Sequence, residues 1–215
     1  MDAQFWLGFI NIIILDLVLS GDNAVVIGMA SRKLPAHQQK KAILYGTIAA
    51  VVLRVALTLI AVWLLKVPLL KAIGGLLLVW IAIKLLVDGD NEEDIEIGSG
   101  LKSAIKTIII ADVVMSLDNV LAVAGAAHGD FLLVLLGLAL SVPILMGGSR
   151  VVATLMNKLP WLVYVGSGIL AYTAGQLLVE DKIIHDNIIV NAPYLTWVTP
   201  VVLILLVLGA GSRRA

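Results

Sequence analysis

Two segments of the chain carry the same polar residues at the same spacing. Residues 16–23 and 112–119 both read D-x-x-x-S-x-D-N, and the two copies are 96 residues apart. Together they supply carboxylates, amides and hydroxyls, from Asp16, Ser20, Asp22, Asn23, Asp112, Ser116, Asp118 and Asn119. No His or Cys lies in the same register. Oxygen ligands alone suit a hard divalent ion, Mn²⁺, Mg²⁺ or Ca²⁺, rather than Zn²⁺ or Cu⁺.

The first segment needs an irregular helix to use all its polar groups. On a regular helix Asp16, Ser20 and Asn23 share one face, and Asp22 lies about 120° away. Asp22 can join that face only if the helix is broken or overwound at the glycine that follows Ser20, which would also free carbonyl oxygens. The second segment has Leu117 in place of this glycine, so the pattern indicates a break less clearly there.

The composition places these polar residues in a membrane. Of 215 residues, 60% are hydrophobic and 14% charged, and the mean hydropathy is +1.05. The chain is therefore predicted to be a polytopic membrane protein whose surroundings are the lipid bilayer, with no soluble domain. The balanced charge gives no support for a nucleic-acid partner, and the absence of Cys excludes disulfides and thiolate metal sites.

Apolar runs predict an all-α fold of seven transmembrane helices. They lie near residues 5–30, 42–65, 68–87, 103–127, 131–155, 160–179 and 194–210. With the N-terminus outside, nine Lys and Arg fall in cytoplasmic connections and three in outer ones. The positive-inside rule then favours a multi-pass protein of the cell membrane with an outer N-terminus and a cytoplasmic C-terminus.

The duplicated segments belong to a larger repeat. The same offset aligns Arg54 with Arg150 in the next span, and an offset of 92 aligns Gly74 with Gly166 in the third, so the repeating unit is three helices. Because three is odd, the second unit must enter the membrane from the opposite face, which gives two inverted repeats and one extra helix. The predicted parts are a first repeat, an acidic cytoplasmic linker, a second repeat, and an outer loop with the seventh helix and basic C-terminus, over residues 1–87, 88–102, 103–180 and 181–215. Inverted repeats are typical of transporters.

The charges inside the predicted spans can be balanced by one ion. Each buried aspartate costs roughly 2.5 to 3.5 kcal/mol to insert, so the four of them need a compensating partner. Four carboxylates, the two arginines Arg54 and Arg150, and one divalent cation add to zero. We expect the arginines to hold the carboxylates when the ion is absent, or to take part in the exchange between states. Crowding should also leave at least one carboxyl protonated in the empty site, and the metal must displace that proton.

The two motifs, as they stand in residues 16–23 and 112–119, resemble the TerC family of integral membrane proteins, within the lysine-exporter superfamily. The resemblance covers nearly the whole chain and is nearest to a short bacterial manganese-exporter branch. It implies Mn²⁺ efflux, with Mn²⁺ as transported substrate and no resident cofactor. The metal residues that it implies are Asp16, Asp22, Asn23, Asp112, Asp118 and Asn119, supported by Ser20, Ser116, Arg54 and Arg150.

The sequence therefore predicts a secondary transporter, not an enzyme, that exports Mn²⁺ through a carboxylate site near the midplane. Proton or Na⁺ antiport is the expected driving force, because the chain has no phosphate-binding G-x-x-x-x-G-K-[ST] loop. A calcium/proton exchanger and an amino-acid exporter are alternatives, and an intramembrane aspartyl protease ranks below them because its G-x-G-D pattern fails at Leu19. A regulatory subunit whose charges bind a partner span, and a homodimer, also stay open.

Overall fold

The computed structural model describes residues 19–64, 67–87, 99–126 and 131–212, together with Trp6, residues 9–10 and 12–14, and Asp16. Every regular element in these ranges is a helix, and none of them contains a strand. The prediction of an all-helical chain is confirmed for this part of the protein. The predicted acidic linker falls largely on residues 88–98, which lie outside the described ranges.

Several long helices are joined by short connections. In chain order they are α2 (Gly21–Ser31), α3 (Ala36–Leu59), α4 (Ala61–Leu64), α5 (Leu70–Val87), α6 (Ser99–Ala126), α7 (Phe131–Lys158), α8 (Leu162–Glu180), α9 (Lys182–Ile184), the π-helix η1 (His185–Ile189) and α10 (Leu195–Ser212).

Four of the described helices are long and apolar enough to cross a membrane. They are Ala36–Leu59, Leu70–Val87, Leu132–Lys158 and Leu162–Glu180, and Leu195–Gly211 is a shorter apolar helix. Large apolar side chains cover much of the outer surface, with Trp63 72% and Trp197 71% exposed. A surface of this kind is stable only against lipid or another protein, so the fold is that of a membrane protein.

The second helix differs from its predicted boundaries of 42–65. It begins at Ala36, because Pro35 adopts an extended conformation (φ −51°, ψ 145°) that starts the helix, and its first turns are polar and therefore missed by hydropathy. It ends at Leu59, where Ile60 leaves the helical region (φ −107°, ψ 12°), and the next turn is the separate helix α4.

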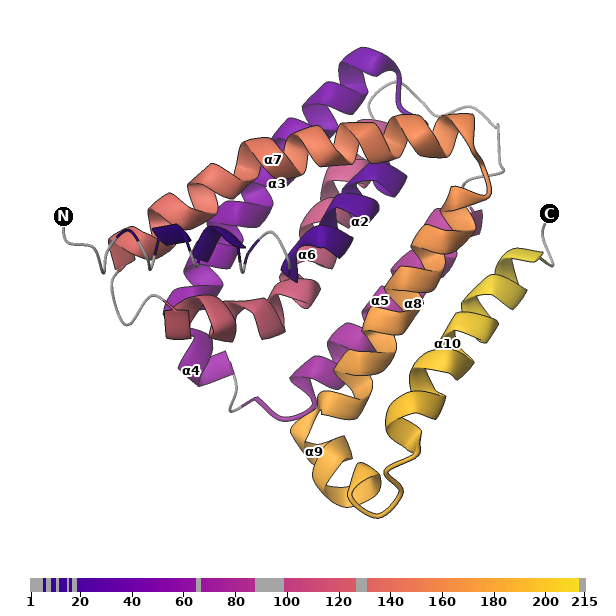
Figure 1. Ribbon diagram of the computed structural model, residues 1–215. Helices are drawn as coiled ribbons and strands as arrows, with labels where there is room; N and C mark the ends of the chain where they lie inside the picture. The colour runs from indigo at the N-terminus through magenta and orange to yellow at the C-terminus, as the bar shows by residue number, and fades with distance from the viewer. Residues whose placement is uncertain are drawn as a thin grey trace.

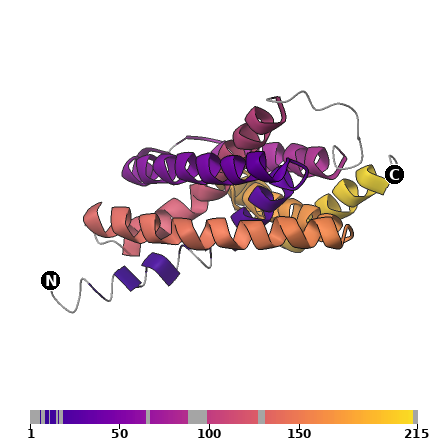
Figure 2. The same cartoon turned by 90° about the horizontal axis from the view of Figure 1, so that it is seen from above.

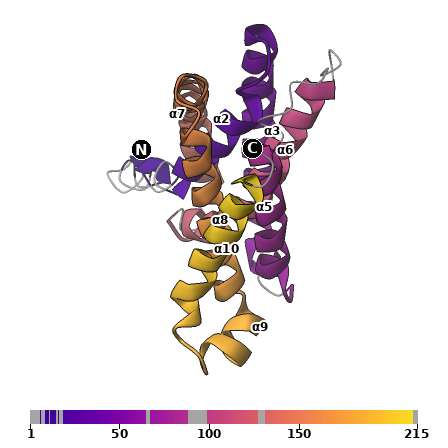
Figure 3. The same cartoon turned by 90° about the vertical axis from the view of Figure 1, so that its right-hand side faces the viewer.

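The helices pack mainly in pairs that combine the two halves of the sequence. α5 packs along α8, α3 along α6 and α2 along α7, while α10 covers α8 and α5 (Figure 1). Seen from above, α3 and α7 run along opposite sides with α2 between them (Figure 2). The side view places α10 beside α8 at the edge of the molecule, with α9 at one end (Figure 3).

Two glycines allow the α5, α8 and α10 group to pack closely. A Cβ atom at Gly75 of α5 would lie 2.7 Å from the carbonyl oxygen of Ala174 on α8. A Cβ atom at Gly175 of α8 would lie 2.5 Å from the Cα atom of Pro200 on α10. Because neither approach leaves room for a side chain, α10 is docked on α8 by backbone contact.

Candidate ion-binding site

The first polar segment contains the predicted break in its helix. Ser20 stands in a turn (φ −104°, ψ 10°), and α2 begins at the next residue, Gly21. Just past the break, the backbone N–H of Asn23 donates to Oδ1 of Asp22 at 2.9 Å. The second segment lies inside the unbroken helix α6, in agreement with the leucine that replaces the glycine there.

Arg54 connects the two segments at the centre of the molecule. Its side chain is 1% exposed, and its guanidinium donates through Nη1 to Asp16 Oδ1 at 2.5 Å and through Nη2 to Asp112 Oδ1. The same group donates to the two serine hydroxyls, from Nη1 to Ser20 at 2.6 Å and from Nε to Ser116 at 2.9 Å. One guanidinium therefore uses its planar array of donors on a carboxylate and a hydroxyl from each segment.

The serines repeat the same local contact in both copies. Ser20 donates to Asp16 Oδ1 at 3.2 Å, and Ser116 donates to Asp112 Oδ2 at 3.2 Å. Both pairs are four residues apart, as the repeat predicts, and all four side chains are buried. The D-x-x-x-S spacing thus places a hydroxyl one helical turn away from a carboxylate, within hydrogen-bond distance.

The side chain of each motif asparagine donates a hydrogen bond to the other segment. Asn23 donates its side-chain amide to Asp112 Oδ1 at 2.8 Å, and Asn119 donates its own to the carbonyl oxygen of Leu19 at 3.1 Å. That carbonyl lies at the helix break, where the expected i, i+4 donor, the N–H of Asn23, binds a carboxylate instead. The break therefore does free a backbone oxygen, and the second segment uses it.

The remaining predicted residues lie away from Arg54 or beyond what the structure describes. Asp22 is half-buried and faces α8, where Thr173 Oγ1 donates to its Oδ2 at 3.4 Å. The backbone of Asp118 belongs to α6, but its side chain lies outside the described part of the chain. Arg150 is exposed on α7, so the structure does not bring it to the cluster, because Ser149 and Ala153 take the buried face of that helix.

Several buried side-chain oxygens have no hydrogen-bond partner, and two of them belong to residues of the cluster. Within the described residues, these unpartnered side-chain oxygens are Asp16 Oδ2, Asn23 Oδ1, Thr47 Oγ1 and Ser167 Oγ. Carboxylate and amide oxygens can only accept, so they require a donor or a cation. The cluster therefore offers more acceptor capacity than Arg54 uses.

No group of three or more His, Cys, Asp or Glu side chains poised to hold a metal occurs within the described ranges. Arg54 lies between the two carboxylates of the cluster, Asp16 and Asp112, and donates to both. Of the four aspartates predicted to converge, the described residues bring together Asp16 and Asp112, whereas Asp22 faces α8.

The repeated pattern does not include two hydroxyls that the structure singles out. Thr173 contacts Asp22 from α8, and nothing in the repeated pattern singles it out. Thr47 lies seven residues before Arg54, which is two helical turns on the same face of α3. That spacing from a buried arginine is a signal that could have identified Thr47.

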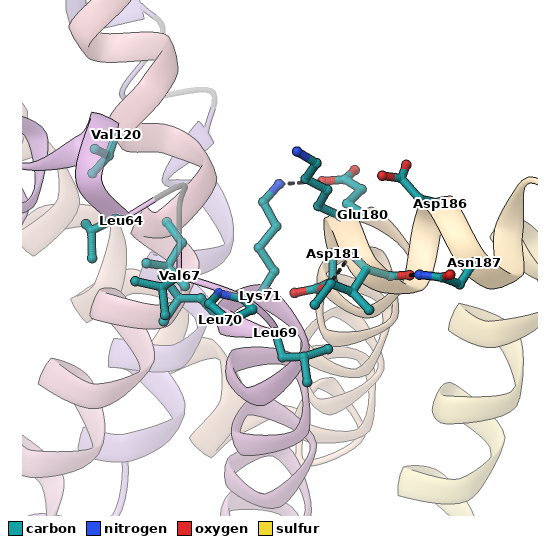
Figure 4. Close-up of a pocket in the computed structure, with 14 residues that line it drawn as sticks. Leu64, Val67, Leu69, Leu70, Lys71, Val120, Glu180, Asp181, Asp186 and Asn187 are labelled. Carbon is teal, nitrogen blue, oxygen red and sulfur yellow. Dashed lines mark hydrogen bonds and ion pairs between the residues drawn. The ribbon is translucent and has the colours of Figure 1, made fainter.

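A cavity of about 770 Å³ opens beside the second segment (Figure 4). It is lined by residues 64 and 67–71, by the end of α8 with α9 and η1, and by Leu117 and Val120 of α6, which flank the end of the motif. Lys71 Nζ faces Glu180 Oε2 across it at 3.4 Å. The buried Asp181 accepts from the backbone N–H of Ala72 at 3.2 Å and of Ile183 at 3.1 Å, and so fixes the starts of α5 and α9.

A helical membrane protein with a buried cluster of ionised groups is the class that this fold and site define. The family model described as "Integral membrane protein TerC family" matches residues 1–214, and the chain belongs to that family. It is 47% identical to the "Uncharacterized membrane protein YjbE" of Bacillus subtilis (strain 168), over 85% of this chain and 84% of that protein.

More distant relatives also match over two thirds or more of each chain. The "Uncharacterized membrane protein YceF" of Bacillus subtilis (strain 168) is 28% identical over 75% of this chain and 67% of its own length. The "UPF0053 inner membrane protein YgdQ" of Escherichia coli (strain K12) is 25% identical over 86% of this chain and 85% of its own. No solved structure matches the chain. The family resemblance drawn from the two motifs is therefore confirmed, and the lysine-exporter superfamily and the manganese branch stay predictions.

Proposed function

We propose that this protein is a secondary transporter that exports a divalent metal ion, Mn²⁺, from the cytoplasm. The observation that carries the proposal is the buried Arg54 guanidinium, held by one carboxylate from each D-x-x-x-S-x-D-N segment. Ionised groups in a membrane interior are costly, and they mark ion pathways when they are retained. The Arg54 guanidinium is itself a cation, and it lies between the two carboxylates that are proposed to bind the metal.

The ligand chemistry favours a hard divalent ion as the substrate. Asp16 and Asp112 supply carboxylates, the serines supply hydroxyls, and Asn23 supplies an amide oxygen without a hydrogen-bond partner in the described residues. Two ionised carboxylates and the Arg54 guanidinium together carry a net charge of −1. We infer that the metal takes the place of the guanidinium between them, and that Arg54 returns when the metal leaves.

The helix pairs support two inverted three-helix repeats. Under the exchange of the first and second units, α2 replaces α6 and α3 replaces α7, so the α3·α6 pair becomes the α2·α7 pair. Both pairs are extensive, and the third helices, α5 and α8, pack on each other. This is the arrangement expected when two halves related by an in-plane axis rock about a shared central site. Seven spans, with α10 as the seventh, follow from the same proposal.

The cavity supports a route to the outer face. In the orientation with an outer N-terminus, residues 67–71 and α9 lie outside, and the cavity leads from there to Leu117 and Val120 beside the second motif. Export of a divalent cation works against a membrane potential of roughly 2.3 kcal/mol per charge per 100 mV, so about twice that for Mn²⁺. The proposed driving force is therefore an inward flow of protons or Na⁺ through the same carboxylates.

The competing functions fit the cluster less well. An amino-acid exporter needs a cation for the substrate carboxylate, but Arg54 already donates to two carboxylates and two hydroxyls of the chain. An aspartyl protease needs two carboxyls that share a proton, whereas a guanidinium separates Asp16 from Asp112. A calcium/proton exchanger uses the same chemistry as the proposed Mn²⁺ exporter, and only measured selectivity separates the two.

Reconstitution tests the proposal directly. The purified protein is placed in liposomes that contain a metal-sensing dye, and Mn²⁺, Ca²⁺, Mg²⁺ and Zn²⁺ are added in turn under imposed pH and Na⁺ gradients. We expect Mn²⁺ flux that depends on one of the two gradients. Flux that ignores both gradients rejects antiport, and absence of divalent flux rejects the proposed function.

A further inference from the structure

We propose that Thr47, together with Asn23, forms an entry position for the metal ion on the side of Arg54 that faces the α2–α3 connection. The inference rests on the proposed function, because it concerns how the same substrate reaches the same carboxylates. It assigns a ligand role to Thr47, which neither the repeated motif nor the Arg54 cluster includes.

The packing of three helices fixes where Thr47 lies. α2 and α3 are joined by a short connection and run in opposite directions, and Ile27 and Ile43 pack in one cluster with Ile108 of α6. Four residues from these isoleucines, in the direction of Arg54, the three helices carry Asn23, Thr47 and Asp112, respectively. Four residues are about one helical turn, or roughly 6 Å along each axis. Asn23, Thr47 and Asp112 therefore form the next level of the bundle.

Observed contacts support this register on both sides of Thr47. On its own level, Asn23 Nδ2 donates to Asp112 Oδ1 at 2.8 Å. Seven residues from Asn23 and from Thr47, beyond the break that precedes α2, Asp16 and Arg54 are in contact at 2.5 Å. Thr47 lies between the isoleucine cluster and Arg54, and its side chain is 1% exposed.

Both oxygens at this level are unpartnered. Asn23 Oδ1 and Thr47 Oγ1 are buried, and neither has a hydrogen-bond partner in the described part of the chain. Asp112 can only accept, so its bond to Asn23 fixes the amide nitrogen toward the carboxylate and leaves the amide oxygen for another ligand. A buried amide oxygen and a buried hydroxyl next to a carboxylate make a ligand set for a hard cation.

The entry position lies between the isoleucine cluster on one side and Arg54 on the other, and this order gives it its role. The cluster of Ile27, Ile43 and Ile108 separates it from the helix ends at the α2–α3 connection, and Arg54 closes its other side. An ion that passes the isoleucines meets neutral oxygens beside Asp112 before it displaces the guanidinium. Thr47 thus allows the metal to be bound while Arg54 still holds Asp16.

The test compares Mn²⁺ binding to the full-length purified protein, measured from the electron paramagnetic resonance signal of free Mn²⁺. Thr47→Val keeps the shape and removes the hydroxyl, and we expect its apparent Kd to rise by about tenfold or more. Thr47→Ser restores the hydroxyl and should restore the affinity. Thr58→Val is the matched control, because that buried hydroxyl on the same helix already donates to the Arg54 carbonyl at 2.8 Å.

The outcomes separate this inference from the proposed function. Mn²⁺ transport by the wild type, with Thr47→Val binding Mn²⁺ as tightly as the wild type, overturns the entry position and leaves the exporter in place. This is also the result expected if only a water molecule bridges the two oxygens. A wild type that neither binds nor moves Mn²⁺ removes both. Should valine prevent folding, Thr47→Ala gives the same comparison.

Discussion

Asn23 of the first segment donates its side-chain amide to Asp112 of the second, with 2.8 Å between Nδ2 and Oδ1. This hydrogen bond and the contacts of Arg54 with Asp16 and Asp112 connect the two repeated segments. Because Asp112 accepts from both residues, any movement of Arg54 changes the charge that Asn23 faces. The Asp112 Oδ1 atom is therefore a point at which Asn23 and Arg54 of the first half both contact the second half.

Replacing Arg54 by Gln should separate binding from transport. The variant removes the cation that competes with the metal, so we expect Mn²⁺ to bind about tenfold more tightly or better, while transport is lost. Without metal, two buried carboxylates lose their partner, and the protein should lose on the order of 3–5 kcal/mol of stability. Thermal unfolding in detergent with and without Mn²⁺ measures both effects.

Arg150→Gln is the control for this experiment. Arg150 is exposed on α7, and the change should leave Mn²⁺ binding and thermal unfolding close to those of the wild type. Weaker Mn²⁺ binding in Arg54→Gln would contradict the idea that the arginine takes the place of the metal.

Asp22→Asn or Asp118→Asn should abolish metal export while membrane insertion stays intact. Each change preserves the side-chain shape and removes one negative charge from a repeated motif. Lys84→Gln is a suitable control, because Lys84 belongs to neither motif and lies on α5 with its Nζ 5.3 Å from the Trp80 ring centroid. Cells that carry each variant are compared for Mn²⁺ tolerance and cytoplasmic Mn²⁺ content. Full activity in both aspartate variants would refute the site.

Mn²⁺ binding should weaken as the pH falls. Carboxylates bind a metal only in their deprotonated form, so protons compete with Mn²⁺ and binding releases protons. The apparent Kd, measured from about pH 8 to about pH 6, should rise continuously, with proton release detectable in weak buffer. A pH-independent Kd would exclude proton exchange at these carboxylates and leave Na⁺ as the coupling ion to test.

The α8–α10 contact gives a prediction about stability alone. Gly175→Ala places a methyl group against Pro200, and overpacking of this kind should cost about 1–3 kcal/mol. Gly168→Ala on the same helix has open space around the new Cβ, and should be neutral or stabilising because alanine favours the helix. Equal unfolding temperatures for the two variants would mean that α10 is not docked as described.

The duplicated motif predicted much of the site because it records local geometry. A carboxylate and a hydroxyl four residues apart must share a helix face, so the Asp16–Ser20 and Asp112–Ser116 pairs could be derived from spacing alone. The break after Ser20 also followed from the glycine. In each case a short stretch of chain determines the outcome.

The sequence could not predict which arginine is buried. Arg54 and Arg150 occupy equivalent positions in the repeat, yet only Arg54 faces the cluster, because the choice depends on how α3 and α7 rotate against α6 and α2. Thr173 was missed for the same reason, since its contact with Asp22 arises only when α8 packs near α2. Local spacing carries no information about these long-range rotations.

The attachment of Arg54 to α3 has a consequence for when the proposed exporter works. Its effective concentration at Asp16 and Asp112 is fixed by the fold and does not vary with the ion content of the cell. A metal ion must outcompete this tethered rival, so its apparent affinity falls by the fraction of time for which the carboxylates are released. The exporter would then be inactive at low Mn²⁺ concentrations and active only above a threshold concentration. The affinity of Arg54 for the two carboxylates would set that threshold, so no separate sensor would be required.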